Sequence, residues 1–414
     1  MPFAKTEPLR RELASALPKR GFTVRFWDGS ELPATSTNGV HGTNGNADPG
    51  PVFTVRSPKA VAYVVRAPGE LGLGRAYVAG ELEVDDLDRV IGLIDDFEEP
   101  EIDRATRARL AIAALRACGL TIPPRAPKGE LRLKGRSHSK DRDAKAVRHH
   151  YDVSNEFFEL FLDKSMTYSC AIFSRGAKTL EEAQFAKLDL VCKKLALKEG
   201  ERVLDVGCGW GAFVIHAARE YGVKAVGITL SPPQAELARR RIAEAGLSDK
   251  IEVRVADYRD LHGERYDAIA SIGMVEHVGE SNIDVYAQKL RNMLGDDGRL
   301  LNHGIAHLYT DVGYHGDFTQ RYVFPDGDPV QLSRVQLALE RAGFVTEHVE
   351  EFGKDYYATL SEWIRRLDEN LVRAEQIAGE ERLRVWRLYL RSARNIFKTE
   401  FVSIYQVLAR PRKG

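Results

Sequence analysis

A short apolar run at residues 203–206 breaks off into three glycines spaced two residues apart, Gly207, Gly209 and Gly211. Glycine adopts backbone angles closed to other residues and lets a ligand approach the main chain. A helix starting at Ala212 would direct its unpaired N–H groups toward that ligand. The spacing G-x-G-x-G differs from G-x-G-x-x-G, the loop that receives a pyrophosphate. The run therefore predicts either a tight strand-to-helix turn or a site for a ligand smaller and less anionic than a dinucleotide.

The chain from Gly200 onward alternates between strand-like and helix-like segments. Ser231 followed by two prolines is typical of a helix start. The alternation predicts an α/β domain with a doubly wound, mostly parallel sheet, interrupted by a polar, aromatic insertion at 311–329. Strands are expected at 202–206, 225–229, 251–255, 266–272, 299–304, 345–352 and 401–408, and helices from Ala212, Pro232 and Ile283 and at 332–342, 360–378 and 381–397.

Composition excludes several classes of protein. The 414 residues carry 60 Lys and Arg against 60 Asp and Glu, so no overall charge favours nucleic acid as a partner. No apolar run approaches the roughly 20 residues of a membrane span, and no signal peptide opens the chain, so we expect it in the cytoplasm. The four cysteines show no C-x-x-C pairing, which predicts neither a metal site nor a disulfide framework.

The N-terminal third has a different pattern. Residues 1–122 predict a small α+β domain with a basic helix at 9–17, strands at 22–27 and 52–55, and a flexible loop at 35–50. A linker at 123–149 follows and is strongly basic. Such a linker is either a solvated tether or a segment attracted to anionic lipid head groups. The second interpretation requires a lipid substrate, and a catalytic domain at 150–414 would then be docked on a membrane by the N-terminal domain.

Side chains at the carboxyl ends of the expected strands describe the ligand. In a doubly wound sheet, ligands bind beyond these ends. The second strand ends in Thr229 and Leu230 with Gln234 nearby, where dinucleotide enzymes place an acid for the ribose. The third ends in Asp257 and Tyr258, an acid and an aromatic suited to adenine. Together they indicate a nucleoside-like ligand without a pyrophosphate, and S-adenosylmethionine satisfies that description better than NAD.

Five motifs in order give the chain a family resemblance. They read H-Y-D-V-S-N-E-F-F from His150, M-T-Y-S-C-A-I-F from Met166, V-L-D-V-G-C-G-W-G from Val203, G-I-T-L-S-P-P-Q from Gly227 and M-V-E-H-V-G from Met274. The chain resembles the family of cyclopropane-fatty-acyl-phospholipid synthases and mycolic acid cyclopropane synthases. That resemblance implies a Rossmann-like, class I S-adenosylmethionine-dependent methyltransferase fold.

The resemblance also implies roles for particular residues. A bicarbonate ion would be held by Cys170, Glu276, His303 and Tyr356, with the backbone N–H of Ile305 directed at the same ion. Tyr168 and Ser169 would hold the amino acid part of S-adenosylmethionine. The complete set implied for this cofactor is Tyr168, Ser169, Asp205, Gly207, Gly209, Gly211, Thr229, Leu230, Gln234, Asp257 and Tyr258.

The chemistry of the family agrees with these residue types. A cis alkene is a weak nucleophile, so accepting a methyl group requires close alignment in a dry pocket. The resulting carbocation would be stabilised by aromatic faces, for which Tyr168, Phe173, Tyr322 and Phe324 are candidates, and bicarbonate would remove the proton that allows ring closure.

We therefore expect an enzyme that forms cyclopropane fatty acids in unsaturated phospholipids at the inner face of the membrane, as a peripheral protein. A methylene-branched product, with a separate reductase partner, and an inactive lipid-binding module are the alternatives. A homodimer is an expectation of the family, and no nucleic acid partner is expected.

Overall fold

The computed structural model describes residues 6–35, 50–95, 102–119, 124–151, 153–308 and 317–413. Nearly all of the loop expected at 35–50, and the part of the expected insertion before Asp317, lie outside these residues. The chain forms two compact units. Within the described ranges, no helix is long and apolar enough to cross a bilayer.

The first unit contains residues up to Glu130 together with α12 (Asp317–Tyr322) and Gly379–Asn395, which is most of α16 (Glu380–Lys398). Its four-stranded sheet has the order β2-β1-β3-β4. An ion pair between Arg75 and Glu130, both almost fully buried, joins two parts of this unit (2.7 Å). The other elements are α1 (Glu7–Ala16), β1 (Thr23–Arg25), β2 (Glu31–Leu32), β3 (Val52–Val55), α2 (Pro58–Arg66), α3 (Glu70–Val78), β4 (Leu82–Val84), α4 (Leu87–Asp95) and α5 (Arg104–Cys118).

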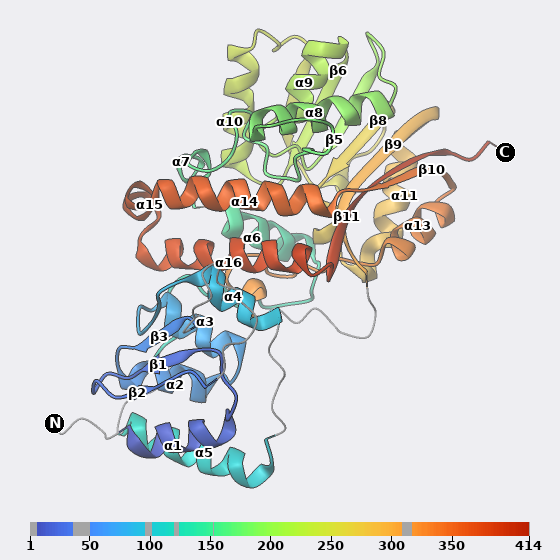
Figure 1. Ribbon diagram of the computed structural model, residues 1–414. Helices are drawn as coiled ribbons and strands as arrows, with labels where there is room; N and C mark the ends of the chain where they lie inside the picture. Colours follow the sequence, from blue (N-terminus) through green and yellow to red (C-terminus); the bar gives the residue numbers. More distant parts are fainter. Residues whose placement is uncertain are drawn as a thin grey trace. The chain divides into compact units, whose positions relative to one another are not determined.

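The second unit is built on a seven-stranded sheet with the order β10-β11-β9-β8-β5-β6-β7 (Figure 1). Strands β5 to β9 pair in parallel, whereas β11 lies antiparallel between β9 and β10. The expected doubly wound, mostly parallel sheet is therefore confirmed. Its strands are β5 (Arg202–Val206), β6 (Lys224–Thr229), β7 (Ile251–Val255), β8 (Tyr266–Ile272), β9 (Leu294–His307), β10 (Phe344–Glu351) and β11 (Val402–Pro411).

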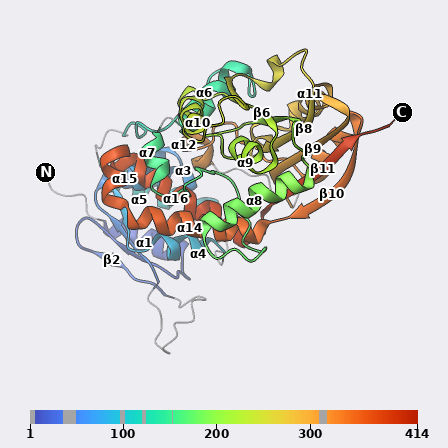
Figure 2. The ribbon, with the colours of Figure 1, turned by 90° about the horizontal axis from the view of Figure 1, so that it is seen from above.

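Helices cover both faces of this sheet, as the view from above shows (Figure 2). Alternate residues of β5 point to opposite faces: Val203 packs with α8, α9 and α10, and Leu204 packs with α11 and α13. The covering helices are α8 (Leu180–Lys194), α9 (Ala212–Tyr221), α10 (Pro232–Glu244), α11 (Ile283–Met293) and α13 (Leu332–Arg341). Short elements complete the unit: α7 (Asn155–Glu159), η1 (Tyr258–Asp260), η2 (Val275–His277) and η3 (Glu280–Asn282).

Two segments differ from the sequence-based expectation. The second half of the expected linker forms α6 (Lys140–Tyr151), because Arg142 makes a charged pair with Asp326 and fixes the segment by contacts that are distant in sequence. The helix expected at 360–378 is two helices, α14 (Gly353–Glu369) and α15 (Leu371–Ala378). Helix α14 begins earlier than expected, and in its first turn the Asp355 carboxylate accepts the backbone N–H of Phe173 and of Ser174.

Candidate active site

The glycine loop forms the turn between β5 and α9. Gly207, Gly209 and Gly211 have φ values of +87°, +52° and +84°, a region that side chains disfavour. The N–H groups of Gly207 and Cys208 both donate to the carbonyl of Ile228 (3.0 and 2.9 Å), which ties the loop to the end of β6. Gly211 is the N-cap of α9. The three glycines are therefore required by the backbone path itself.

Two buried residues of opposite charge, one near the end of β5 and one on α8, influence each other's pKa. The side chains of Asp205 and Lys187, from α8, are 2% and 1% exposed, and each charge acts on the other. Burial raises the pKa of Asp205 to about 7, and Lys187 opposes this shift. Burial lowers the pKa of Lys187 to about 8. In the described part of the chain, Oδ1 of Asp205 has no hydrogen-bond partner, so one oxygen is available to a ligand beside the glycine loop.

The segment that carries Tyr168 and Ser169 is held by α8. The Gln184 side chain donates to the carbonyls of Thr167 and Ser169 (3.2 and 2.9 Å), and Lys187 Nζ donates to Ser169 Oγ (2.9 Å). Helix α8 is itself fixed at its start by a capping box between Thr179 and Glu182. Gln184 and Lys187 thus position the segment that the family resemblance implies for binding the cofactor.

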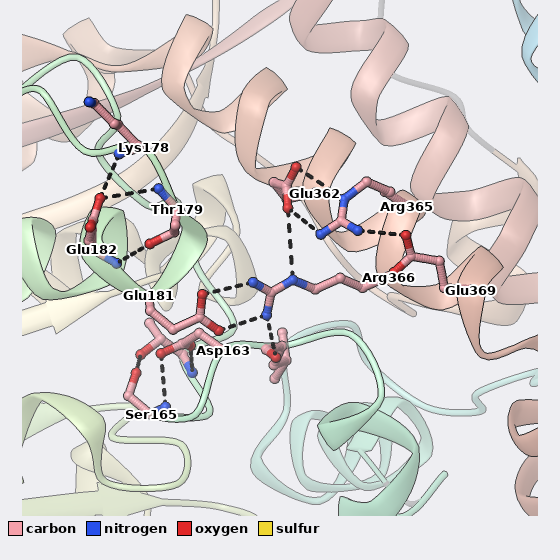
Figure 3. Close-up of polar contacts among 12 residues, drawn as sticks. Asp163, Ser165, Lys178, Thr179, Glu181, Glu182, Glu362, Arg365, Arg366 and Glu369 are labelled. Carbon is pink, nitrogen blue, oxygen red and sulfur yellow. Dashed lines mark hydrogen bonds and ion pairs between the residues drawn. The ribbon is translucent and has the colours of Figure 1, made fainter.

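Arg366 joins helix α14 to the start of α8 and to the chain at Leu162 (Figure 3). Its guanidinium group makes two hydrogen bonds to the Glu181 carboxylate (2.9 and 2.8 Å) and one to the carbonyl of Leu162 (3.2 Å). One helical turn earlier, Trp363 stacks on the ring of Tyr168, with centroids 5.0 Å apart. The Arg366 pair therefore supports an aromatic wall around Tyr168.

The residues implied for ribose and adenine, at the ends of β6 and β7, make different kinds of contact. Thr229 and Gln234 are buried and hydrogen-bond each other (2.7 Å), and Leu230, which follows Thr229, is partly buried. Asp257 forms an ion pair with Arg259 (2.6 Å). Tyr258 packs in the core, edge-on to Tyr286. The roles implied for these residues toward ribose and adenine stay predictions.

Phe352 brings together three of the four residues implied for the anion: Cys170, Tyr356 and His303. Its carbonyl accepts from the Cys170 thiol (3.7 Å) and from the backbone N–H of Tyr356 (3.0 Å). Its ring stacks on that of His303, with centroids 6.3 Å apart. Burial raises the pKa of the Cys170 thiol well above its ordinary value, so this thiol is neutral at physiological pH.

Glu276 approaches the same region from η2. Its Oε1 accepts the backbone N–H of Ile305 (2.8 Å). The contact implied between this N–H and an anion stays a prediction. Gly304 allows the approach, since a Cβ there would lie 2.2 Å from the Val275 side chain. Burial raises the pKa of Glu276 to about 7. Its second oxygen, Oε2, is enclosed and has no partner among the described residues.

Gln406 fixes which ring nitrogen of His303 carries the proton. The two residues pair across β11 and β9, and Gln406 Nε2 lies 3.1 Å from His303 Nδ1. An amide nitrogen only donates, so Nδ1 accepts and the ring proton lies on Nε2. Burial lowers the pKa of His303 well below its ordinary value, so the ring is neutral. His303 Nε2 is enclosed and, within the described ranges, has no partner, which makes it an N–H donor for a ligand.

The four aromatic residues suggested as walls for a cation are not all in one place. Tyr168 and Phe324 both contact His150, with centroids 5.6 and 4.0 Å away. Phe173 is bound through its backbone to Asp355. Tyr322 belongs to the first unit, where it stacks on Phe318. Within the second unit, Tyr168 and Phe324 are thus the two that share a neighbour.

The same residues match a known family. The family model described as mycolic acid cyclopropane synthetase matches residues 138–407, which include every residue of the site above. The chain belongs to this family. It is an S-adenosylmethionine-dependent methyltransferase of the cyclopropane synthase type, with the class I fold, and the family acts on lipid acyl chains.

Relatives cover different shares of the chain. A Pseudomonas putida protein named as a probable fatty acid methyltransferase is 37% identical over 394 residues, 93% of this chain and 91% of its own. The cyclopropane-fatty-acyl-phospholipid synthase of Escherichia coli is 34% identical over 358 residues, 86% of each chain. The solved cyclopropane synthase MmaA2 from Mycobacterium tuberculosis is 33% identical with a TM-score of 0.62, and covers 64% of this chain and 97% of its own. The alignments with the first two relatives are therefore long enough to extend into the N-terminal unit, whereas MmaA2 covers a smaller share of this chain.

Sequence reasoning missed four residues that position the site. They are Gln184 and Lys187 on α8, Phe352 before α14, and Gln406 on β11. A lysine in an otherwise amphipathic helix gives no signal of burial. A glutamine in the middle of an apolar strand does give one, because a buried amide requires a partner.

Proposed function

We propose that this protein transfers the methyl group of S-adenosylmethionine to the cis double bond of acyl chains in membrane phospholipids and forms cyclopropane fatty acids. The observation that supports it best is the pair of enclosed, unpartnered atoms described above, Glu276 Oε2 and His303 Nε2. The preference for phospholipid over mycolic acid is supported by the extent of the match: the Escherichia coli phospholipid enzyme aligns with 86% of this chain, whereas MmaA2 covers 64%.

Bicarbonate fits the pair of unpartnered atoms. It has one O–H, which suits the Glu276 carboxylate, and anionic oxygens, which suit the N–H of His303 Nε2. The Gln406 contact keeps that N–H in place. An anion held there would accept the proton lost from the new methyl group, so that the electron pair of the broken C–H bond closes the ring.

The other residues align the reactants and exclude water. Bound S-adenosylmethionine supplies an electrophilic methyl group on sulfur. The glycine loop and Asp205 would hold its polar end, and the ring of Tyr168, braced by Trp363, would face the cation formed on the acyl chain. Alignment of this kind and a dry pocket are what a weak alkene nucleophile requires.

A methylene-branched product is the second candidate, with a reductase partner to complete a methyl branch. It is favoured by one observation: the Pseudomonas putida relative, more similar than the Escherichia coli enzyme, is named as a probable fatty acid methyltransferase. Both products arise from the same first cation, and both lose a proton from the new methyl group. The methylene product differs because a hydride first moves from the methyl-bearing carbon to the neighbouring cationic carbon, so that the C–H electrons then form a double bond instead of a ring.

Incubation with vesicles of dioleoyl phospholipid separates these outcomes. We expect release of S-adenosylhomocysteine, and lipid that shows cyclopropane ring protons by NMR with a mass increase of one CH₂. An exocyclic methylene signal would establish the second candidate instead. If no unsaturated lipid leads to S-adenosylhomocysteine release, the chain is an inactive lipid-binding module and the proposal is wrong.

We further propose that the basic segment helps the protein to dock peripherally on the anionic inner face of the membrane. Lys134, Arg136, Lys145 and Arg148 are exposed on and before α6. Each contributes about 1 kcal/mol near an anionic surface, so changing all four to Gln should weaken binding to phosphatidylglycerol vesicles by at least about 100-fold. Binding of the unchanged protein should also fall with salt.

Flotation with vesicles measures this effect. The matched control changes four exposed lysines elsewhere in the second unit, Lys178, Lys193, Lys198 and Lys250, to Gln. An equal loss in both quadruple variants would mean that net charge alone matters. Binding that is indifferent to salt and to anionic lipid would leave the segment as a solvated tether.

A further inference from the structure

Lys187 is a buried cation for which the chemistry above has no role. Lys187 is 1% exposed, and its Nζ donates a hydrogen bond to Ser169 Oγ (2.9 Å). An ammonium group removed from water is costly unless it meets anions or acceptors. Among the described residues the hydrogen-bond partner of this ammonium group is a neutral hydroxyl, while Asp163 and Asp205 are carboxylates whose charges act on it. A second residue of α8, Gln184, donates to the carbonyls of Thr167 and of Ser169 and so holds the backbone that carries this hydroxyl.

The position of Lys187 also indicates what kind of ligand it could bind. Its charge and that of Asp205 act on each other, which puts it at the carboxyl end of β5, where the glycine loop begins. By accepting a hydrogen bond from Nζ, Ser169 Oγ is left with its own O–H free to donate. Lys187 and Ser169 thus offer two adjacent donors, one of them charged, to an anionic group beside the loop.

The cofactor carries one such group. S-adenosylmethionine and its product S-adenosylhomocysteine end in an amino acid, which has a carboxylate and an ammonium group. We propose that Lys187, directly and through Ser169, is the receptor for the cofactor's carboxylate. The inference rests on the cofactor of the proposed function and does not depend on the lipid acceptor. Asp205, of opposite sign, then faces the ammonium end, so the site matches a zwitterion.

Two ligands that differ only in the carboxylate test this inference by calorimetry. The first is S-adenosylhomocysteine and the second is its decarboxylated analogue, which keeps the adenosine and the amine. In Lys187→Met the Kd of S-adenosylhomocysteine should rise by about 10- to 100-fold, the usual range for a charged hydrogen bond. The Kd of the decarboxylated analogue should change by less than about 3-fold on the same basis.

The matched control is Lys193→Met, which removes an exposed lysine of the same helix that pairs with Asp189; neither Kd should change. Lys187→Gln keeps a donor to Ser169 without the charge, and it replaces the Met variant if that variant does not fold. An equal rise for both ligands would show that Lys187 only supports the fold, and no rise for either would show that it does not contact the cofactor. Both results overturn the inference. No lipid is present in the assay, so failure of the proposed acceptor would leave these results unaffected.

Discussion

Glu276→Gln is expected to lower turnover by at least about 10³-fold while the Kd of S-adenosylhomocysteine changes by less than about 3-fold. The amide can still accept the backbone N–H of Ile305 through its oxygen, so η2 keeps its position. Its nitrogen replaces Oε2 with a donor, which repels the O–H of an anion that the carboxylate would accept. Methyl transfer assays and calorimetry on the same preparation measure the two quantities.

The same variant should be more stable than the unchanged protein at high pH. Burial raises the pKa of Glu276 to about 7 from an ordinary 4.5. Between these values the folded protein binds a proton that the unfolded chain has released, so its free energy of unfolding falls as pH rises. A Gln side chain does not titrate, so the stability of the variant lacks this pH dependence. The Tm of Glu276→Gln should therefore exceed that of the unchanged protein at pH 8, and the excess should vanish near pH 4. Loss of S-adenosylhomocysteine binding would contradict the role given to Glu276.

Gly211→Val is expected to abolish detectable cofactor binding and to lower the Tm. Gly211 has a φ of +84°, which a β-branched residue strongly disfavours, and its Cβ would lie 3.2 Å from that of Ala238. The loop must shift to relieve both, and a shift of about 1 Å removes the alignment that a bound cofactor requires. Calorimetry with S-adenosylhomocysteine measures the loss.

Gly246→Val is the control variant that separates the effect of backbone strain from the effect of a change in the cofactor site. Gly246 has a similar φ, +68°, with no atom within 4 Å of an added Cβ, and it lies beyond the end of α10. This variant should lose stability by about 1–3 kcal/mol, the cost of a sparsely populated backbone region, and should bind S-adenosylhomocysteine normally. If the two variants lose cofactor affinity equally, the glycine loop has no special role in binding.

The parallel strands of the second unit could be expected from sequence because each strand and each helix start carries a local signal. The spacing of apolar residues predicts β5 to β8, and Ser231 predicts the start of α10. The insertion of β11 between β9 and β10 has no such signal. It depends on which sheet edge the last strand can reach once β9 is formed. Helix α6 was missed for a related reason, since the Arg142 pair with Asp326 joins residues 184 positions apart.

The sequence by itself predicted which segments carry the chemistry. The glycine spacing and the motifs around Glu276 and His303 are local in sequence, so they can be recognised without the tertiary structure. Only the tertiary structure decided what surrounds them. Lys187 reaches Ser169 from one helix turn after Gln184, Gln406 reaches His303 across two antiparallel strands, and Phe352 joins Cys170 to His303. These contacts depend on packing between segments, and packing determines burial, protonation state and which polar atoms are left for a ligand.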